Sequence, residues 1–251
     1  MDLPEGSLLA TVPFGPAEDE RLTGLAVIPV MKAGDTPHLA DRLLHPAELA
    51  TAAAFASEVR RRSYISGRIA AKLAIRQVFP GLSGPEVHIT ANPLGKPIAE
   101  GLPGPYSVSI SHSDHHGAAV CFPAAFPMGV DIETPEEKNR PIISSILTGE
   151  ELTLLQTHHG SLEYLHVIWT AKEAAGKTTG LGFRLPVRHY EISKIVNQTS
   201  GERFYWTSHF KKIKDITTHS LKWQGAILTL AFPSLYEPID LMRYLHMEPD
   251  K

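Results

Sequence analysis

Apolar and polar residues follow two kinds of pattern along the chain, and these patterns predict its secondary structure. Short apolar runs bounded by turn residues predict strands. In the first half, such runs lie at 25–31, 87–90, 106–111 and 118–122. An alanine-rich stretch predicts a long helix or a pair of helices from Pro46, since proline suits a first helical turn, to the break at Pro80-Gly81. Pro29 lies within the first strand and favours an edge position or a bulge there.

A second block of elements follows a connector-like stretch at 123–128. The block contains a strand at 128–132, helices at 148–156 and 162–178, and alternating segments at 188–195, 203–210 and 221–232. The alternation predicts strands of an antiparallel sheet. The connector therefore divides the chain into an N-terminal half, 1–125, and a C-terminal half, 126–251.

Two short segments recur at a nearly constant offset. LLHPAEL at 43–49 is similar to ILTGEEL at 146–152, 103 positions later. Downstream, YISGRIAAK at 64–72 and VIWTAKEAAGK at 167–177 keep nearly the same offset, and both place basic residues in a helical stretch. A duplication accounts for both similarities, although short alanine-rich helices also look alike by chance. We therefore expect two related halves of mixed α/β (α+β) structure.

Composition and charge exclude several classes of protein. The 251-residue chain is 43% hydrophobic and 20% charged, which is ordinary for a globular protein with a substantial core. A formal net charge of −3 argues against nucleic-acid binding as the main activity. Cys121 is the only cysteine, so a disulfide within the chain is impossible and a cytoplasmic location fits best. We expect neither a signal peptide nor a membrane span, since no stretch approaches the ~20 apolar residues that a span needs.

Paired carboxylates mark the segment GVDIE at 129–133. Residues two apart on a strand project to one face, so Asp131 and Glu133 lie together while Val130 and Ile132 pack inward. Two such carboxylates repel each other and favour a cation between them. Oxygen ligands of this kind suit Mg²⁺, which often also binds substrate phosphates. The plain alternative is an exposed strand end with two solvated acids.

The segment WTAKEAAGK at 169–177 predicts a helix with a charged stripe. Trp169, Glu173 and Lys177 are spaced by four and share one face, with Lys172 beside them. The stripe places an acid between two bases, next to an aromatic ring. The plain alternative is a salt-bridged surface helix, in which a Glu–Lys pair contributes roughly 0.2–0.5 kcal/mol.

Three further segments carry groups that suit phosphate recognition. SISHS at 109–113 ends a predicted strand with Ser111 and His112, NPLGKP forms a turn that presents Lys96, and RRR at 60–62 begins a basic helix face. Taken singly, each segment is more often simply solvated. A zinc site, a Ser–His nucleophile and a P-loop are not supported, because their ligand sets, elbow and glycine-rich loop are missing from the sequence.

The ordered set of segments resembles the Sfp-type (surfactin-synthetase-activating) 4'-phosphopantetheinyl transferase family. That family carries a G-[IV]-D-[IV]-E strand and, downstream, a [FW]-x-x-K-E-x-x-x-K helix. Here Glu133 and Trp169 are 36 positions apart, as the family pattern expects. The resemblance covers roughly 44–183, whereas the first 40 residues and the tail after about residue 184 match no family segment.

The resemblance implies two similar α/β halves related by a pseudo-twofold axis, each a small sheet packed with a long helix, with coenzyme A in the cleft between them. The implied Mg²⁺ ligands, in the C-terminal half, are Asp131, Glu133 and Glu173. The implied pyrophosphate contacts are Lys172 and Lys177. The implied surroundings of the adenosine 3'-phosphate are Lys96, Ser111, His112 and an arginine of 60–62, with Arg62 as the best match.

The implied reaction is Mg²⁺-dependent transfer of the phosphopantetheine arm of coenzyme A to a serine of an apo acyl or peptidyl carrier protein. Adenosine 3',5'-bisphosphate is released, and catalysis rests on positioning and charge neutralisation by Asp131, Lys172 and Glu173. Glu173 is the expected base for the serine proton, with Glu150, Glu151 or a metal-bound water as alternatives. One chain with both halves suffices as a monomer, and its length suits the polyketide or nonribosomal peptide type of transferase.

Two other functions are compatible with some of the same residues. Another Mg²⁺-dependent nucleotidyl or phosphoryl transferase has a use for the carboxylates and lysines, but this function does not explain the SHS and GKP segments together. A non-catalytic module that binds carrier proteins would not need the acids and lysines. The chain retains them, which argues against this function. Binding of coenzyme A against ATP distinguishes the first of these functions, and transfer activity the second.

Overall fold

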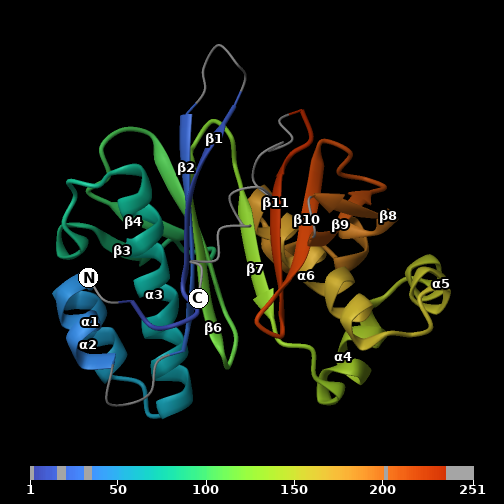
Figure 1. Cartoon of the computed structure of the whole chain (residues 1–251), viewed down its shortest axis with the longest axis horizontal. Helices are drawn as coiled ribbons and strands as arrows, with labels where there is room; N and C mark the ends of the chain where they lie inside the picture. The colour runs from blue at the N-terminus through green and yellow to red at the C-terminus, as the bar shows by residue number, and fades with distance from the viewer. Residues whose placement is uncertain (1–2, 16–20, 31–35, 201–202, 236–251) are drawn as a thin grey trace. The chain divides into compact units, whose positions relative to one another are not determined.

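The computed structural model describes residues 3–15, 21–30, 36–200 and 203–235. The described residues form two compact units, one that ends at Pro127 and one that begins at Met128. Each unit combines a β-sheet with α-helices (Figure 1), so the expected mixed α/β fold class is confirmed. The pseudo-twofold axis stays a prediction. Within the described residues, no helix is long and apolar enough to cross a bilayer.

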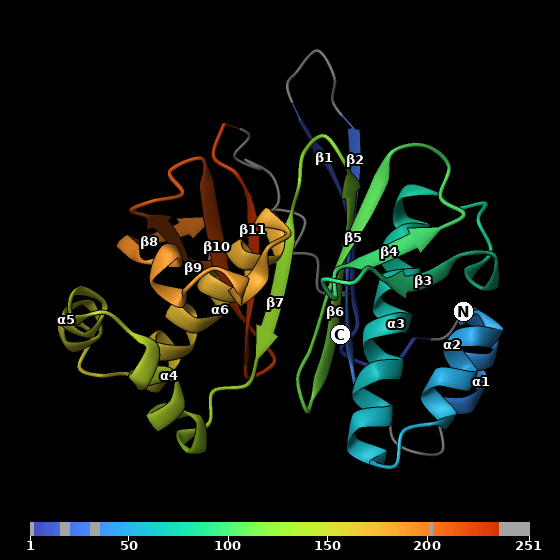
Figure 2. The same ribbon diagram turned by 180° about the vertical axis from the view of Figure 1, so that it is seen from behind.

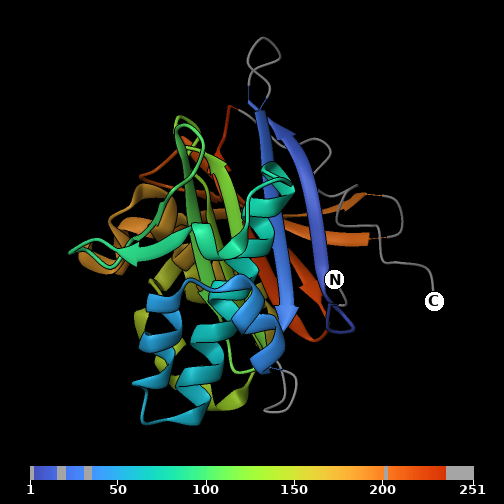
Figure 3. The same cartoon turned by 90° about the vertical axis from the view of Figure 1, so that its left-hand side faces the viewer.

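Unit 1, the described residues up to Pro127, is built on an antiparallel sheet with the strand order β1-β2-β6-β5. Its strands are β1 (Leu8–Phe14), β2 (Arg21–Pro29), β3 (His88–Ala91), β4 (Pro97–Glu100), β5 (Tyr106–His112) and β6 (His116–Pro123). Its helices are α1 (Thr36–Leu43), α2 (Pro46–Ala53) and α3 (Glu58–Val78). Strands β3 and β4 pair separately, and Figure 3 shows β1 and β2 side by side in blue.

Helix α3 packs on the sheet of unit 1 at very short range. Ser57 caps its first turn by accepting the backbone N–H of Arg60. A Cβ added to Gly24 of β2 would collide with the carbonyl oxygen of Ala74 on the helix. Glycine therefore lets β2 and α3 approach backbone to backbone. The buried apolar side chains of α3 fill the space between this sheet and helices α1 and α2.

Unit 2, the described residues from Met128, has an antiparallel sheet with the strand order β7-β11-β10-β9-β8. Its strands are β7 (Gly129–Glu133), β8 (Ile192–Ser200), β9 (Arg203–Phe210), β10 (Ile216–Trp223) and β11 (Ala226–Pro233). Its helices are α4 (Arg140–Ile146), α5 (Gly149–Thr157) and α6 (Leu162–Thr179). Helix α6 lies against the sheet (Figure 2), and Gly180 ends it in a left-handed conformation, with φ of 71°.

Two strand predictions in the tail are wrong in detail. The segment 188–195 begins as a 3₁₀ turn, Val187–Tyr190, with a hydrogen bond from the backbone N–H of His189 to the carbonyl of Pro186, and β8 starts only at Ile192. The segment 221–232 contains a hairpin turn between β10 and β11. Gln224 and Gly225 both have positive φ there, which is typical of a tight two-residue turn.

Candidate active site

The carboxylates of β7 face helix α6. Gly129, Asp131 and Glu133 share one side of the strand, and a Cβ added to Gly129 would collide with the carbonyl oxygen of Ala174 on α6. Asp131 is buried, with 3% of its surface exposed. Burial against a helix excludes the plain alternative of two solvated acids at an exposed strand end.

Lys177 of α6 reaches back to this strand. Its ammonium donates hydrogen bonds to the Asp131 carboxylate (2.8 Å) and to the carbonyl of Val130 (3.0 Å). The Trp169 side chain, two turns earlier on the same helix, hydrogen-bonds to Glu133. The stripe predicted from residues 169, 173 and 177 therefore does face the paired carboxylates, and α6 is not a solvated surface helix.

Negative charge accumulates at this cluster. Burial raises the pKa of Glu133 to about 7, and the charge of Asp131 adds to this effect. Burial and then Asp131 likewise raise the pKa of Glu173 to about 7, while the ammonium of Lys177 acts in the opposite direction. The ammonium of Lys177 thus acts on all three carboxylates, and three acids grouped in this way attract further positive charge.

These three carboxylates, Asp131, Glu133 and Glu173, have the right chemistry for Mg²⁺, since hard oxygen ligands are what this ion prefers. Among the described residues, however, no three His, Cys, Asp or Glu side chains are placed to hold a metal ion together. Lys177 instead supplies the positive charge beside Asp131. Metal binding by this set stays a prediction.

Lys172 has a different environment from the rest of the predicted set. Its side chain is fully buried, and its Nζ forms an ion pair with Glu151 of α5 at 2.6 Å. The Glu151 carboxylate also accepts the backbone N–H groups of Thr148 and Ile192. The predicted contact between Lys172 and a pyrophosphate stays a prediction. The alternative base Glu151 is enclosed by these contacts.

The alternative base Glu150 lies at the surface of unit 2. Its carboxylate is 71% exposed and pairs with Lys211 at 2.5 Å.

The predicted phosphate-binding residues lie in two parts of unit 1. Ser111 is the second-last residue of β5 and is buried, and His112, the last residue of the strand, is exposed. A Cβ on Gly67 of α3 would lie 3.5 Å from the His112 ring, so this imidazole packs beside the helix. Lys96 lies elsewhere, in the turn between β3 and β4, where the Asn92 side chain accepts its backbone N–H.

Arg62 lies close to the strand end that carries Ser111 and His112. The next residue on α3, Ser63, donates a 3.5 Å hydrogen bond to the carbonyl of Ser113. The Nε of Arg62 is buried and makes no hydrogen bond within the described part of the chain. Arg62 thus combines proximity to this strand end with an unused donor.

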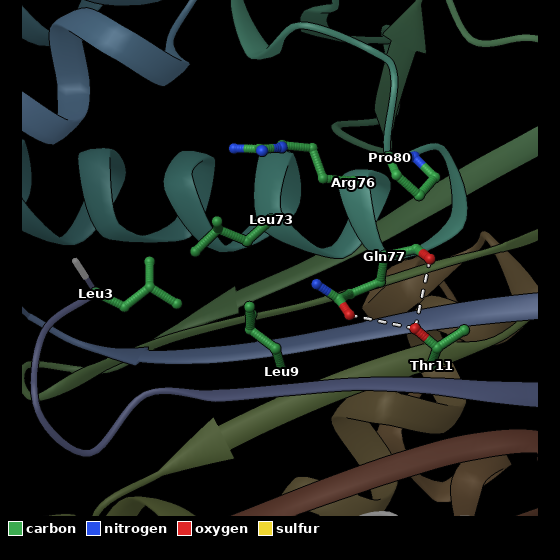
Figure 4. A pocket seen from close by; sticks show the side chains of 7 residues that line it. All are labelled: Leu3, Leu9, Thr11, Leu73, Arg76, Gln77 and Pro80. Atoms are coloured by element: carbon green, nitrogen blue, oxygen red, sulfur yellow. Dashed lines mark hydrogen bonds between the residues drawn. The ribbon is translucent and has the colours of Figure 1, made fainter. Parts of the chain in front are cut away.

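A pocket of about 470 Å³ opens in unit 1 on the side of α3 near β1 (Figure 4). Its lining residues are Leu3, Leu9, Thr11, Leu73, Arg76, Gln77 and Pro80. Thr11 holds the Gln77 side chain through a 3.2 Å hydrogen bond to its amide oxygen. None of the predicted site residues lines this pocket.

The buried ion pairs were missed by sequence reasoning. Glu151 pairs with Lys172 in unit 2, and Glu48 pairs with Lys72 in unit 1 at 2.9 Å. The repeated segments LLHPAEL and ILTGEEL contained the signal, because they align Glu48 with Glu151.

Comparison with known proteins finds a family model that matches the stretch of unit 2 that contains the cluster. Residues 127–231 match the family model of the 4'-phosphopantetheinyl transferase superfamily. A stretch of 110 residues is 30% identical to the 4'-phosphopantetheinyl transferase gsp of Aneurinibacillus migulanus and covers 43% of this chain and 44% of that protein. The match therefore spans less than half the length of this relative.

A solved structure is also similar to this chain. The holo-[acyl-carrier-protein] synthase (AcpS) of Thermotoga maritima shares 23% sequence identity, with a TM-score of 0.33, over 52% of this chain and 74% of that one.

Proposed function

We propose that this chain, whose residues 127–231 belong to the 4'-phosphopantetheinyl transferase superfamily, transfers the phosphopantetheine arm of coenzyme A to a serine of an apo carrier protein. One observation carries the proposal. Asp131, Glu133, Glu173 and Lys177 all lie within the matched stretch and are gathered between β7 and α6. Buried carboxylates with raised pKa values are typical of functional sites.

The proposed reaction is a displacement at phosphorus. The serine oxygen forms a bond to the β-phosphorus of coenzyme A, and the bond from that phosphorus to the bridging oxygen breaks. Adenosine 3',5'-bisphosphate leaves with the electron pair of the broken bond. Such reactions depend mainly on positioning and on neutralising charge.

The residues of unit 2 divide these tasks. Asp131, Glu133 and Glu173 are the proposed ligands of Mg²⁺, which when bound would neutralise charge on the pyrophosphate oxygens. Lys177 holds Asp131 in the free protein and binds pyrophosphate oxygens in the complex. Glu173 accepts the proton of the serine hydroxyl.

The residues of unit 1 bind the nucleotide end of coenzyme A in this proposal. Arg62 is adjacent to Ser63, which contacts Ser113 just after β5, and with Ser111 and His112 it binds the 3'-phosphate through charge-assisted hydrogen bonds in this proposal. Lys96 adds a positive charge from the β3–β4 turn. The acceptor is an acyl or peptidyl carrier protein, and a monomer suffices.

Intact-mass spectrometry tests the proposal. The purified protein is incubated with coenzyme A, Mg²⁺ and several apo carrier proteins, and each carrier is weighed. We expect one carrier or more to gain the mass of one phosphopantetheine arm, and a chelator to abolish the gain. Asp131→Asn, which keeps the side-chain shape, is the matched inactive control.

Binding measurements separate this activity from that of other Mg²⁺-dependent transferases. Isothermal titration with coenzyme A and with ATP is expected to show Mg²⁺-dependent binding of coenzyme A only. Absence of mass gain on every carrier, together with absence of coenzyme A binding, would overturn the proposal. Tight Mg²⁺-dependent binding of ATP alone would replace it with a nucleotidyl or phosphoryl transferase.

A further inference from the structure

Lys172 and Glu151 connect three elements of unit 2. Lys172 lies in the middle of α6 and Glu151 in the first turn of α5. One oxygen of the Glu151 carboxylate pairs with Lys172 and also accepts the N–H of Ile192, the first residue of β8, at 2.9 Å. The other oxygen accepts the N–H of Thr148 at the start of α5, also at 2.9 Å. The pair therefore ties α6 to both α5 and β8.

A similar connection occurs in unit 1, where the lysine also donates hydrogen bonds to two backbone carbonyls, those of Gly84 and Val87. Lys72 of α3 pairs with Glu48 of α2, and Glu48 accepts the N–H of His45 (2.8 Å) and of Ile89 (3.0 Å). In both units the glutamate and the strand residue are 41 positions apart. The residue after Lys72 is Leu73, whereas the residue after Lys172 is Glu173. An ion pair of this kind can therefore stabilise the packing of the helices without any contact between the lysine and a bound molecule.

Burial makes Lys172 a poor contact for a ligand in this structure. Both its side chain and that of Glu151 have 0% exposure. Loss of solvation lowers the pKa of Lys172, and the hydrogen bond and charge of Glu151 act against this. A buried ion pair that loses one partner leaves an uncompensated charge. Moving Lys172 to a pyrophosphate would strand Glu151 in this way.

The pair lies next to the residues that carry the chemistry. Glu173 follows Lys172 directly, and the next residue, Ala174, has its carbonyl against the backbone of Gly129 on β7. Glu173 thus lies between two residues through which α6 contacts other elements. Lys172 connects the helix to α5 and β8, and Ala174 lies against β7. Both contacts set the rotation and height of α6 relative to Asp131.

We propose that Lys172 is a positioning residue, which through its ion pair with Glu151 holds α6 so that Glu173 and Lys177 face the carboxylates of β7. The inference rests on the proposed transferase function for its kinetic consequences. It assigns the contacts with the pyrophosphate to Lys177 and not to Lys172. Lys72 is the structural counterpart that lacks this consequence.

Lys172→Met and its counterpart Lys72→Met test the proposal as a matched pair. Each removes one partner of a buried pair, so each is expected to lower Tm by roughly 10 °C. Only Lys172→Met is expected to lower kcat, by roughly 10- to 100-fold, because a small misplacement of reacting groups is costly. The KM for coenzyme A is expected to rise by less than about tenfold, because displacement of α6 weakens the contact of Lys177 with the pyrophosphate without removing it.

The double variant Lys172→Met/Glu151→Gln provides the rescue. It removes both charges, so much of the Tm and kcat lost in the single variant is expected to return. A rise in the KM for coenzyme A that the second substitution does not reverse would assign Lys172 to the ligand and overturn the proposal. An unchanged kcat in a destabilised Lys172→Met protein would also overturn it, because the pair would then stabilise the fold without positioning Glu173.

Fluorescence gives a readout that does not depend on activity. Trp169 lies on α6 and hydrogen-bonds to Glu133, so its emission reports the placement of the helix. The Trp169 component is obtained by subtracting the spectrum of the same variant with Trp169→Phe. We expect this component to change in Lys172→Met, to recover in the double variant and to stay constant in Lys72→Met. If the wild-type protein neither transfers nor binds coenzyme A, the proposed function fails, whereas an unchanged Trp169 component overturns the positioning role alone.

Discussion

The two units share a packing frame and differ in the side chains placed on it. In each unit, a glycine lets a strand touch the backbone of the long helix, and a buried Lys–Glu pair ties that helix to a shorter one. The shared residues are Gly24 and Gly129, Ala74 and Ala174, Lys72 and Lys172, and Glu48 and Glu151. At the intervening positions the two units diverge.

The divergent positions hold the charged cluster in unit 2 and apolar or neutral groups in unit 1. The register set by the shared residues matches Asp131 with Ala26, Glu133 with Ile28, Glu173 with Leu73, and Lys177 with Gln77. Leu73 and Gln77 line the pocket of unit 1, where β1 supplies Thr11 to bind Gln77 (Figure 4). The packing frame is therefore separable from the charged cluster, since a few substitutions on one frame create or remove that cluster.

The largest effect is expected when unit 2 is given the residue of unit 1. Asp131→Ala reproduces Ala26 and removes the carboxylate that pairs with Lys177. We expect carrier modification to fall by roughly 10³-fold or more, because charge neutralisation at the phosphoryl group is worth several kcal/mol. Initial rates from intact-mass measurements check this. Near-normal turnover would show that the cluster is not the catalytic centre.

Glycine substitutions break the shared frame itself. Gly129→Ala and Gly24→Ala each place a Cβ against a helix carbonyl, and we expect each to lower the free energy of unfolding by about 2–3 kcal/mol. Denaturant titration measures that loss. Transfer by the folded fraction is expected to drop about tenfold or more only in Gly129→Ala, because only α6 carries reacting groups. Equal losses of activity would contradict the division of roles between the units.

Lys177→Gln converts another position of unit 2 to its counterpart. The Lys177 side chain is 27% exposed, but the Asp131 carboxylate that it pairs with is buried, so we expect the free energy of unfolding to fall by about 1–3 kcal/mol. Coenzyme A binding in the presence of Mg²⁺ is expected to weaken roughly tenfold, by about 1.4 kcal/mol, as a charge contact to phosphate is lost. Titration calorimetry measures the affinity. An unchanged affinity would mean that Lys177 serves only to hold Asp131.

The pH dependence of stability gives a smaller difference between the units. The pKa of Glu173 is about 7 in the folded protein against an ordinary value of 4.5, so the folded state binds the proton more tightly. Its contribution is therefore full below about pH 4.5 and is lost as the pH rises through about 7, on the order of 2 kcal/mol in metal-free protein.

Glu173→Leu, which reproduces Leu73, is expected to flatten this decline. The Tm of the variant and of the wild type, measured in chelator between pH 5 and pH 8, checks this expectation. A change of 1 kcal/mol corresponds to roughly 2–4 °C in Tm. An equal slope in both proteins would show that Glu173 is not the group that titrates.

Local pattern predicted much of the fold, and spacing predicted the cluster. The predicted strand 128–132 and helix 162–178 match β7 and α6 to within one residue at each end, because alternation and a four-residue stripe are properties of the sequence itself. Spacing could not show that Lys172 is turned away from Glu173, since adjacent residues on a helix point about 100° apart and tertiary packing selects which direction is buried.

Other differences also have tertiary causes. Pro29 favoured an edge strand, but β2 lies between β1 and β6, and Pro29 is tolerated because pairing with β1 stops at Val27. Strand β1 was not expected at all, and it is held by its pairing with β2 along all seven of its residues. The half-buried positions of β1 include Leu9 and Pro13, so its residues LLATVPF do not alternate plainly between apolar and polar although its burial does.

Coenzyme A binding with and without Mg²⁺, in the wild type and in Asp131→Ala, shows whether the carboxylates of unit 2 bind a metal ion that assists the substrate. Calorimetric titration gives the four dissociation constants under one set of conditions. The cluster of unit 2 predicts that Mg²⁺ tightens coenzyme A binding by about tenfold or more in the wild type and has little effect in Asp131→Ala. Equal strengthening by Mg²⁺ in both proteins, or binding of coenzyme A that ignores Mg²⁺ altogether, would contradict a metal-assisted site at Asp131.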